Sequence, residues 1–510
     1  MTRASAQQVS HVCANPYNLR RKRGVRFARA RPETVSTAFK AEGSQVSSPA
    51  RRTGEALFPR HGIGGALTRL WLHVPLLALL PALASAQGGE WPTLSGVGLE
   101  YLSQSGFLQV SLSGQLDVES MLVGEDRWAG LVGHQSGDSV PAEWVTACAD
   151  CHQMEGVRQA GKGGHVNAHR LRLFADVFLG DHLYSLVEVR SDRGPAPANH
   201  SIKTRVEQAY VRLLAPAGGW GVQAGKFASP FGAYALRHLT VVDPFLRPPL
   251  PYDYRTIMSP SHVPPDAAGL LTWKEWPELF RIPGSPPVWD VPYQWGAMIF
   301  GRLGPVDLRV AAVNSAPSSD PEAWGFDGDR LRHPSWVAGA RTKPSASLEI
   351  GASYNRGPWM EEITRGTILA PPGAAPGSSP PSFRDFQQEM VSIDFAYARG
   401  PLMVRGEAIL DQWDVPNVAD RPTERLYSLE LQSDLTAGLF AAARVGFVDF
   451  RPIDDGSGTR VDWDHDVHRV EGSLGYRLVR NAGVLLSAYR QSDERGGDTL
   501  LGGLRMWWAF

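Results

Sequence analysis

Polar and apolar residues alternate with a period of two along most of the chain from residue 105 onward. In the segment 106–119 the apolar set runs along the even positions, from Leu108 to Val118, and polar residues such as Asp117 and Glu119 lie between them. This period is typical of a β-strand with one apolar face. Soluble β-sandwiches alternate in the same way, so the connectors must decide between the fold classes.

The connectors between the strands are short and long in turn. We predict strands at residues 106–119, 168–179, 183–191, 204–214, 219–227, 293–303, 305–314, 336–343, 346–356, 389–399, 401–412, 425–435, 438–450, 467–479, 483–491 and 498–510. Every second connector is tiny, such as "GDH" or "LG", whereas the alternate ones run through residues 120–167, 228–292, 315–335 and 357–388. Short turns on one rim, long loops on the other and an even strand number are the plan of bacterial outer-membrane barrels. The sequence therefore predicts an all-β fold, a 16-stranded antiparallel transmembrane β-barrel of the outer-membrane porin type, over residues 105–510.

The last residues of the chain agree with this plan. In "LLGGLRMWWAF" the apolar residues Leu504, Met506, Trp508 and Phe510 alternate down to a terminal aromatic residue. Such a carboxyl-terminal strand resembles the insertion signal of outer-membrane barrels. An ordinary terminal strand is the alternative, but it does not explain the pattern of the preceding strands.

The amino-terminal part of the chain reads as a targeting region. Residues 69–86, "RLWLHVPLLALLPALASA", combine a basic flank, a short apolar stretch and small residues at Ala84 and Ala86. This is the layout of a secretory signal peptide, whereas a membrane anchor would need a longer run without prolines. We interpret the basic residues 1–68 as a presequence or a mis-assigned start, and 87–104 as a periplasmic segment. Together with the barrel pattern, the signal predicts a location in the bacterial outer membrane.

The charge balance changes once the targeting region is set aside. Residues 1–86 hold 13 Lys and Arg against 3 Asp and Glu, so the remainder holds 38 basic and 49 acidic residues. An acidic exported protein is a poor partner for nucleic acid. Lipid of the outer membrane is instead the expected environment of the barrel.

One short motif does not belong to an ordinary barrel. In "TACADCHQM", residues 146–154, Cys148 and Cys151 are spaced so that both thiols can add to the vinyl groups of one haem, and His152 then binds the iron. The remaining cysteine, Cys13, falls in the presequence. A disulfide would ignore the histidine, and a zinc site would need a second close Cys or His pair. The motif thus predicts one covalently bound haem c.

A haem that transfers electrons is expected to have a sixth ligand. His165 and His169, in "GGHVNAH" where the loop rejoins the wall, are the candidate distal ligands, and His134 is a third option. Met154 lies two residues beyond His152, too close in sequence to reach the opposite face of the ring. Each histidine can equally be a solvated residue of a loop or rim.

Residues 204–233 include the stretch "EQAYVRLLAPAGGWGVQAGKFASPFG". It resembles the core of the phosphate-selective porins of the O and P type, in which an alternating "AYV" strand is followed by a tight turn and a strand that leads into Pro-Phe-Gly. The resemblance implies a sixteen-stranded pore, commonly a homotrimer. Phosphate selectivity would need a ladder of inward Arg and Lys. The predicted inward positions mix both signs: Arg170, Arg172, Arg190 and Arg212 with Asp117, Glu119, Asp176, Glu188, Glu430 and Asp434.

The position of the haem motif also resembles the fused cytochrome-porins of iron-oxidising bacteria, in which a single Cys-x-x-Cys-His precedes the barrel. Here it follows the segment 106–119. If that segment is a wall strand, residues 120–167 form a haem-bearing first long loop, and otherwise they form a periplasmic plug.

The resemblance implies electron transfer across or at the outer membrane, between a periplasmic c-type cytochrome and an external donor or acceptor. The alternative is a passive diffusion porin for small solutes, in which the haem segment is a plug or sensor. A haem enzyme is less favoured because the sequence has no distinctive acid-base pair.

Overall fold

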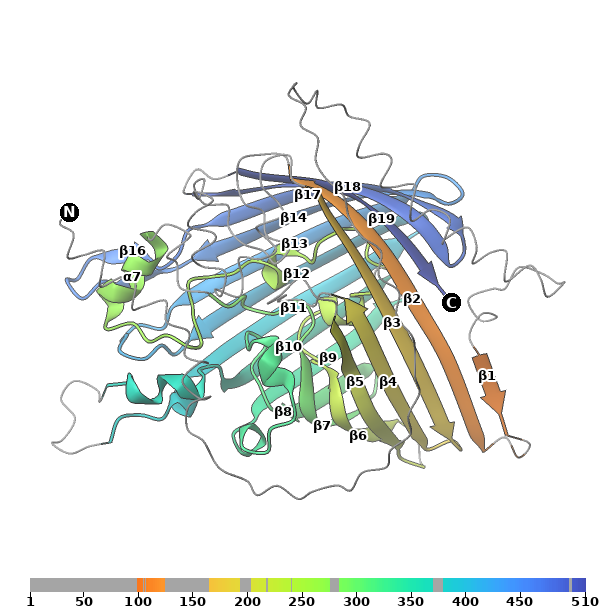
Figure 1. Cartoon of the computed structure of the whole chain (residues 1–510), viewed down its shortest axis with the longest axis horizontal. Coiled ribbons are helices and arrows are strands. Elements are labelled where there is room, and N and C mark those ends of the chain that lie inside the picture. The colour runs from red at the N-terminus through yellow and green to blue at the C-terminus, as the bar shows by residue number, and fades with distance from the viewer. Residues whose placement is uncertain are drawn as a thin grey trace, which may run out of the picture. The chain divides into compact units, whose positions relative to one another are not determined.

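The computed structural model of the protein describes residues 99–510, with gaps at 104, 106, 124–164, 193–202, 217–218, 240, 276–283, 370–378 and 495–497. Sixteen strands follow one another around a single antiparallel sheet (Figure 1). They are β2 (Leu108–Val123), β3 (His165–Leu179), β4 (Leu183–Asp192), β5 (Lys203–Leu214), β6 (Trp220–Ala228), β7 (Tyr293–Leu303), β8 (Val306–Val313), β9 (Ser335–Ser345), β10 (Leu348–Pro358), β11 (Gln387–Arg399), β12 (Leu402–Trp413), β13 (Thr423–Asp434), β14 (Leu439–Phe450), β17 (Val467–Val479), β18 (Ala482–Asp493) and β19 (Asp498–Ala509).

The pairing of β19 with β2 closes the sheet into a barrel. The carboxyl terminus takes part in this seam, because Gly114 N donates to Phe510 O over 2.6 Å and Phe510 N donates to Gly114 O over 2.8 Å. A side chain at position 114 would not fit, since its Cβ would lie 2.5 Å from the Phe510 ring. The aromatic terminus predicted from the sequence is thus part of the closed wall.

The outward positions of the wall form an exposed apolar surface. On β11, Val391, Ile393 and Phe395 are 44%, 61% and 38% exposed, whereas the inward Met390 and Ser392 are fully buried. The same alternation continues on the neighbouring strands, for example at Leu429, Leu431, Phe447, Val470 and Leu486. A soluble protein does not expose an apolar surface of this extent, whereas lipid surrounds such a face in a membrane barrel.

The connectors divide between the two rims as the sequence predicts. The links after β3, β7, β9, β11 and β17 are tight turns, and they define the short-turn rim. The amino-terminal end of β2 and the carboxyl-terminal end of β19 lie at the same rim. The long links after β6, β8, β10 and β14 begin and end at the opposite rim, where β2 also ends and β3 begins; this is the external rim in barrels of this kind. No helix among the described residues is long and apolar enough to cross a membrane.

The predicted strands are confirmed with small shifts at their ends. The segments 293–303 and 467–479 coincide with β7 and β17, and the segment 106–119 is a wall strand, β2. Residues 124–164, which include most of the predicted haem loop, lie outside the described residues; in the sequence they stand between β2 and β3.

Several smaller elements were not predicted. β1 (Leu99–Leu102) pairs with the first residues of β2, beyond the end of β19. β15 (Pro452–Asp454) and β16 (Arg460–Asp462) form a small hairpin at the external rim. The long connectors hold α7 (Ala267–Glu275), η2 (Tyr234–Leu236), η3 (Leu250–Tyr252), η5 (Pro321–Trp324), η6 (Arg330–Arg332), η7 (Glu362–Gly366) and η8 (Phe383–Asp385).

Candidate functional site: the lumen and its inner loop

We call the connector between β6 and β7, residues 229–292, the inner loop. Its first part turns into the barrel, whereas its helix α7 lies beyond the strand ends beside β16, where Lys274 donates to Asp462 O over 2.6 Å (Figure 1). It turns inward at Gly232, whose φ is 72° and whose Cβ, if present, would lie 2.1 Å from the Tyr252 hydroxyl. Gly232 N donates to Ser353 Oγ over 2.9 Å, and Ala233 N donates to Glu407 Oε1 over 2.9 Å. Because Ser353 and Glu407 are inward residues of β10 and β12, the loop starts by crossing the lumen.

Three inward arginines of the last wall strands hold the middle of the inner loop, and we call them the arginine anchor. Arg505 donates to the carbonyl oxygens of residues 245 and 246 over 2.7 and 2.9 Å. Arg444 donates to those of residues 247 and 248 over 2.6 and 3.2 Å. Arg469 donates to the carbonyl of residue 248 over 3.3 Å and pairs with Asp253 over 2.7 Å. The anchor therefore satisfies loop carbonyls that would otherwise be buried without a partner.

Buried carboxylates of the wall neutralise the anchor. Arg444 pairs with Glu471 over 2.5 Å and with Glu430 over 3.4 Å, and Arg505 pairs with Glu119 over 2.8 Å. These side chains are at most 8% exposed. A buried charge that loses its partner is costly, so each arginine is coupled both to the loop and to the wall.

Apolar packing fixes the inner loop against one side of the barrel. Its aromatic and aliphatic side chains join the inward residues of β6 to β14 in one core, and η3 contacts β13 and β14. The loop contributes Phe231, Tyr234, Leu250, Tyr252, Tyr254, Ile257, Met258, Leu270, Trp273, Val288 and Trp289 to this core. The lumen is thus narrowed by a packed structure, and not by a chain that crosses open water.

The other side of the lumen is charged. On β2 to β5 the inward residues form ion pairs, and Asp192 accepts from three arginines, Arg190, Arg205 and Arg170, over 2.6, 2.7 and 3.1 Å. Arg205 also pairs with Glu207 over 2.6 Å. Wide polar lumens of this kind are typical of porins.

A buried histidine links the inner loop to this charged wall. His238 Nε2 lies 3.0 Å from the Tyr293 hydroxyl and its Nδ1 lies 2.7 Å from Ala235 O, while Arg172 donates to the same hydroxyl over 3.4 Å. Burial, with the positive charge of Arg172 next, lowers the pKa of His238 to about 3. His238 is therefore neutral at physiological pH, donates through Nδ1 and accepts through Nε2.

Asp243 gives the inner loop a pH-dependent stability. Its carboxylate accepts from Tyr234 Oη over 3.1 Å and from Phe245 N over 3.2 Å, and burial raises its pKa to about 6 against the opposing effect of Arg444 and Arg237. The folded value lies above the ordinary 3.8, so the folded state holds the proton more tightly. This group therefore contributes stability below pH 4 that is lost as the pH rises to about 6, with an upper bound of about 3 kcal/mol.

We expect Asp243→Asn to remove this dependence, because the amide keeps the shape of the group and does not ionise. Urea unfolding of both proteins from pH 4 to 7 measures it. The stability of wild type relative to Asp243→Asn should rise as the pH falls, and a difference that is constant with pH would contradict the assignment.

The residues predicted to hold haem fall mostly outside the described part of the chain. Cys148, Cys151 and His152 are among them, as are His134 and Met154. His165 begins β3, where its Cα lies opposite Leu122 of β2. His169 is exposed and lies on the same, outward side of β3 as the lipid-facing Leu173, so its side chain is directed away from the lumen. Within the described residues, no group of three or more His, Cys, Asp or Glu is arranged to hold a metal ion.

The predicted inward charges of the lumen are confirmed in large part. Arg172, Arg190, Asp117, Glu119, Glu188 and Glu430 are all buried inside the barrel. Asp434 shares the inward side of β13 with Glu430, but it lies at the short-turn rim, where it pairs with Arg477 over 3.0 Å and is half exposed. The arginine anchor and the inner loop's aromatic residues were not predicted. A long connector rich in Pro and aromatic residues, as in "DPFLRPPLPYDY" (243–254), was the available signal, because such a loop is rarely solvated.

No protein-family model matches the sequence, and no curated protein matches it. Solved structures that resemble the chain include the outer-membrane channel DcaP of Acinetobacter baumannii, with 12% identity over 80% of this chain and 99% of that one at a TM-score of 0.45. Others are an anion-selective porin from Comamonas acidovorans (10% identity, 79% and 100%, TM-score 0.43) and OmpT of Vibrio cholerae (10%, 79% and 98%, 0.43). Because these scores lie below 0.5, the strand register of the chain itself establishes the fold.

Three features of the described residues indicate the same fold. The sheet is a closed ring of sixteen antiparallel strands, its outer face is apolar, and its inner face is polar and partly filled by a loop. No soluble sandwich combines these features, because each sheet of a sandwich keeps its edges. The chain therefore folds as a sixteen-stranded antiparallel transmembrane β-barrel, which is the architecture of outer-membrane porins.

Proposed function

We propose that the barrel is a diffusion channel for small hydrophilic solutes with a preference for anions. One observation carries the preference: a row of inward arginines lies on the wall toward the short-turn rim. Its members are Arg212 of β5, Arg309 of β8, Arg341 of β9 and Arg405 of β12, which we call the arginine row. None of them is fully buried.

The arginine row is only partly neutralised. Arg212 donates to the neutral Gln223 over 2.7 Å, and neither Arg212 nor Arg309 forms an ion pair with a described residue. Arg341 pairs with Glu349 over 2.5 Å and with Asp394 over 3.0 Å, and the three side chains are 19%, 25% and 4% exposed. Two guanidinium groups of the row therefore lack a carboxylate partner, although the chain after residue 86 is acidic overall.

The inner loop supports a size limit on the solute. It covers the carboxylates of β12 and β13, such as Glu407 and Glu430, which are 7% and 2% exposed. A solute on this path therefore meets the arginine row, while these acidic groups are covered by the loop. Phosphate, for which the porin family that residues 204–233 resemble is named, is one member of this anion class.

Reversal potentials of the purified barrel in planar bilayers under a salt gradient test the proposal. We expect anion preference in wild type, and a shift toward cations in Arg212→Gln/Arg309→Gln, because two unpaired charges are removed. Arg399→Gln is the matched control, since Arg399 is an exposed, outward residue at the same rim. Cation preference in wild type, or an equal shift in the control, would refute the proposal. The homotrimer implied by the resemblance would appear as conductance steps in threes.

A second function is favoured by the haem motif. We infer that the first long loop holds one covalent haem through Cys148 and Cys151, with His152 as iron ligand and His165 or His169 as candidate distal ligands. A bound haem would supply reversible one-electron transfer. In the sequence the motif stands between β2 and β3, whose adjoining ends are at the external rim, so a periplasmic cytochrome would have to reach a haem there through the lumen of a wall about 25 Å tall.

Liposomes loaded with a reduced c-type cytochrome test this second function. Wild type should pass electrons to an external acceptor that is too large to enter the pore. His152→Ala should stop the transfer and keep the conductance, because the wall is untouched. If the variant transfers electrons as fast as wild type, the protein is a diffusion channel alone.

A further inference from the structure

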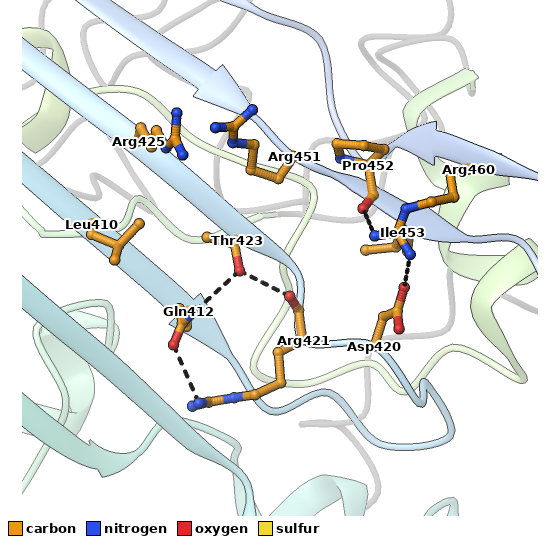
Figure 2. Close-up of a pocket in the computed structure, with 10 residues that line it drawn as sticks. All are labelled: Leu410, Gln412, Asp420, Arg421, Thr423, Arg425, Arg451, Pro452, Ile453 and Arg460. Carbon is orange, nitrogen blue, oxygen red and sulfur yellow. Dashed lines mark hydrogen bonds and ion pairs between the residues drawn. The ribbon is translucent and has the colours of Figure 1, made fainter.

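The outer face of the barrel has a basic hollow at the external rim, at the ends of β12, β13 and β14 (Figure 2). Its volume is about 380 Å³. Its polar lining includes Arg421, Arg425, Arg451, Arg460 and Gln412, and Leu410 forms the apolar side of the hollow. We call it the rim pocket.

The strand alternation shows that the rim pocket faces outward. Arg425 shares its side of β13 with Tyr427, Leu429 and Leu431, which are 41%, 48% and 46% exposed. Arg451 follows the exposed Phe447 by four residues on the same side. The ladder continues to this point, because Arg451 N donates to the carbonyl oxygen opposite it, Thr423 O, over 2.9 Å. The pocket is therefore separate from the lumen.

Two of the arginines are held in place by the protein. Arg421 pairs with Asp414 over 2.7 Å and with Glu389 over 3.1 Å, and it donates to Gln412 over 3.2 Å. Arg460 pairs with Asp420 over 3.4 Å and donates to Pro452 O over 2.5 Å. Figure 2 draws the contact of Arg421 with Gln412 and those of Arg460 with Asp420 and Pro452, which build one side of the pocket.

The other two arginines are the uncompensated ones. Arg425 and Arg451 lie diagonally across β13 and β14, and Figure 2 shows their guanidinium groups directed toward one another. Asp449 lies directly opposite Arg425 in the strand register, yet neither arginine forms an ion pair with any described residue. Long side chains on diagonal positions of neighbouring strands can reach each other, so the two positive charges repel, and an anion bound between them would remove this repulsion.

The apolar surroundings narrow the class of anion. The pocket opens where the lipid-facing surface ends, with Leu410, 39% exposed, on its side and Tyr427 and Phe447 just toward the membrane. A free anion makes no favourable contact with this apolar side. A membrane lipid, in contrast, packs its acyl chains against it and places its headgroup at the rim. We propose that the rim pocket binds the phosphorylated headgroup of an anionic lipid of the outer leaflet, with Arg425 and Arg451 as its phosphate ligands.

Native mass spectrometry of the purified full chain tests this proposal, with lipid A, a diphosphorylated acyl-glucosamine disaccharide, as the probe. Wild type should retain it, and Arg425→Gln/Arg451→Gln should bind at least about tenfold more weakly, because charge-assisted hydrogen bonds to phosphate are lost. Arg399→Gln, at the opposite rim of the same wall, should bind as wild type does. Arg425→Lys/Arg451→Lys preserves the charge and should retain part of the binding. Such retention would show that the site still folds when both arginines are replaced.

Two further arms separate the possible ligands. Dephosphorylated lipid A should bind wild type no better than it binds the double glutamine variant. Inorganic phosphate should not displace the lipid at equal concentration, and displacement would instead identify a site for free phosphate. Equal retention of lipid A by wild type and the double glutamine variant would overturn the proposal.

Discussion

Removing the arginine anchor should open the channel. In Arg444→Gln/Arg505→Gln the inner loop loses the donors to the carbonyl oxygens of residues 245–248, and Glu119 and Glu471 lose their buried partners. Leaving a buried charge unpaired costs on the order of 3–5 kcal/mol, so the loop is expected to leave its docked position. Single-channel records should then show a higher and noisier conductance than wild type, because the loop no longer narrows the lumen.

The control for this prediction is Arg477→Gln. Arg477 is also an inward arginine in an ion pair, with Asp434 over 3.0 Å, but it is 41% exposed and lies at the short-turn rim. An exposed pair contributes about 0–1 kcal/mol, so the conductance should not change. If both proteins conduct as wild type does, the apolar core of the inner loop holds it without the anchor.

Replacing both cysteines of the motif should abolish haem attachment. Two thioether bonds survive denaturation, whereas bonds to a metal ion do not. Wild type should therefore keep a peroxidase-active haem band on a denaturing gel, and Cys148→Ala/Cys151→Ala should lose it completely. Retained stain in the double variant would exclude covalent attachment through this motif.

Histidine variants provide the matched controls. His165→Ala and His169→Ala should retain the stained band, because a distal ligand does not contribute to the covalent link. The absorption spectrum of the reduced protein then separates the two histidines, since only loss of the true distal ligand changes the coordination of the iron.

The wall was predictable because its rules are local. Alternation with a period of two follows from the pleat of each strand, and tight turns such as the one at Gly400, with φ 58°, mark the strand ends. Both signals lie within about a dozen residues of the strand they define. The positions of the strands, the rims and the inward charges could therefore be predicted from the sequence.

The inner loop was not predictable because its contacts join distant parts of the chain. Arg505 is 260 residues from the carbonyl that it binds, and Tyr252 donates to Glu407 across 155 residues over 2.8 Å. No period in the sequence records such pairs. The rim pocket has the same origin, because Arg425 and Arg451 meet only through the register of β13 with β14.

The three anchor residues come from β14, β17 and β19, which are among the last strands of the chain to be made. The inner loop precedes them all, so it cannot be fixed before the carboxyl-terminal third is in place. Contacts of such large sequence separation form late, because closing a long loop is entropically costly. Assembly therefore has a fixed order. The inner loop docks on the arginine anchor, and so narrows the lumen, only when β19 pairs with β2 and closes the barrel. An incompletely assembled barrel would lack the narrow passage altogether.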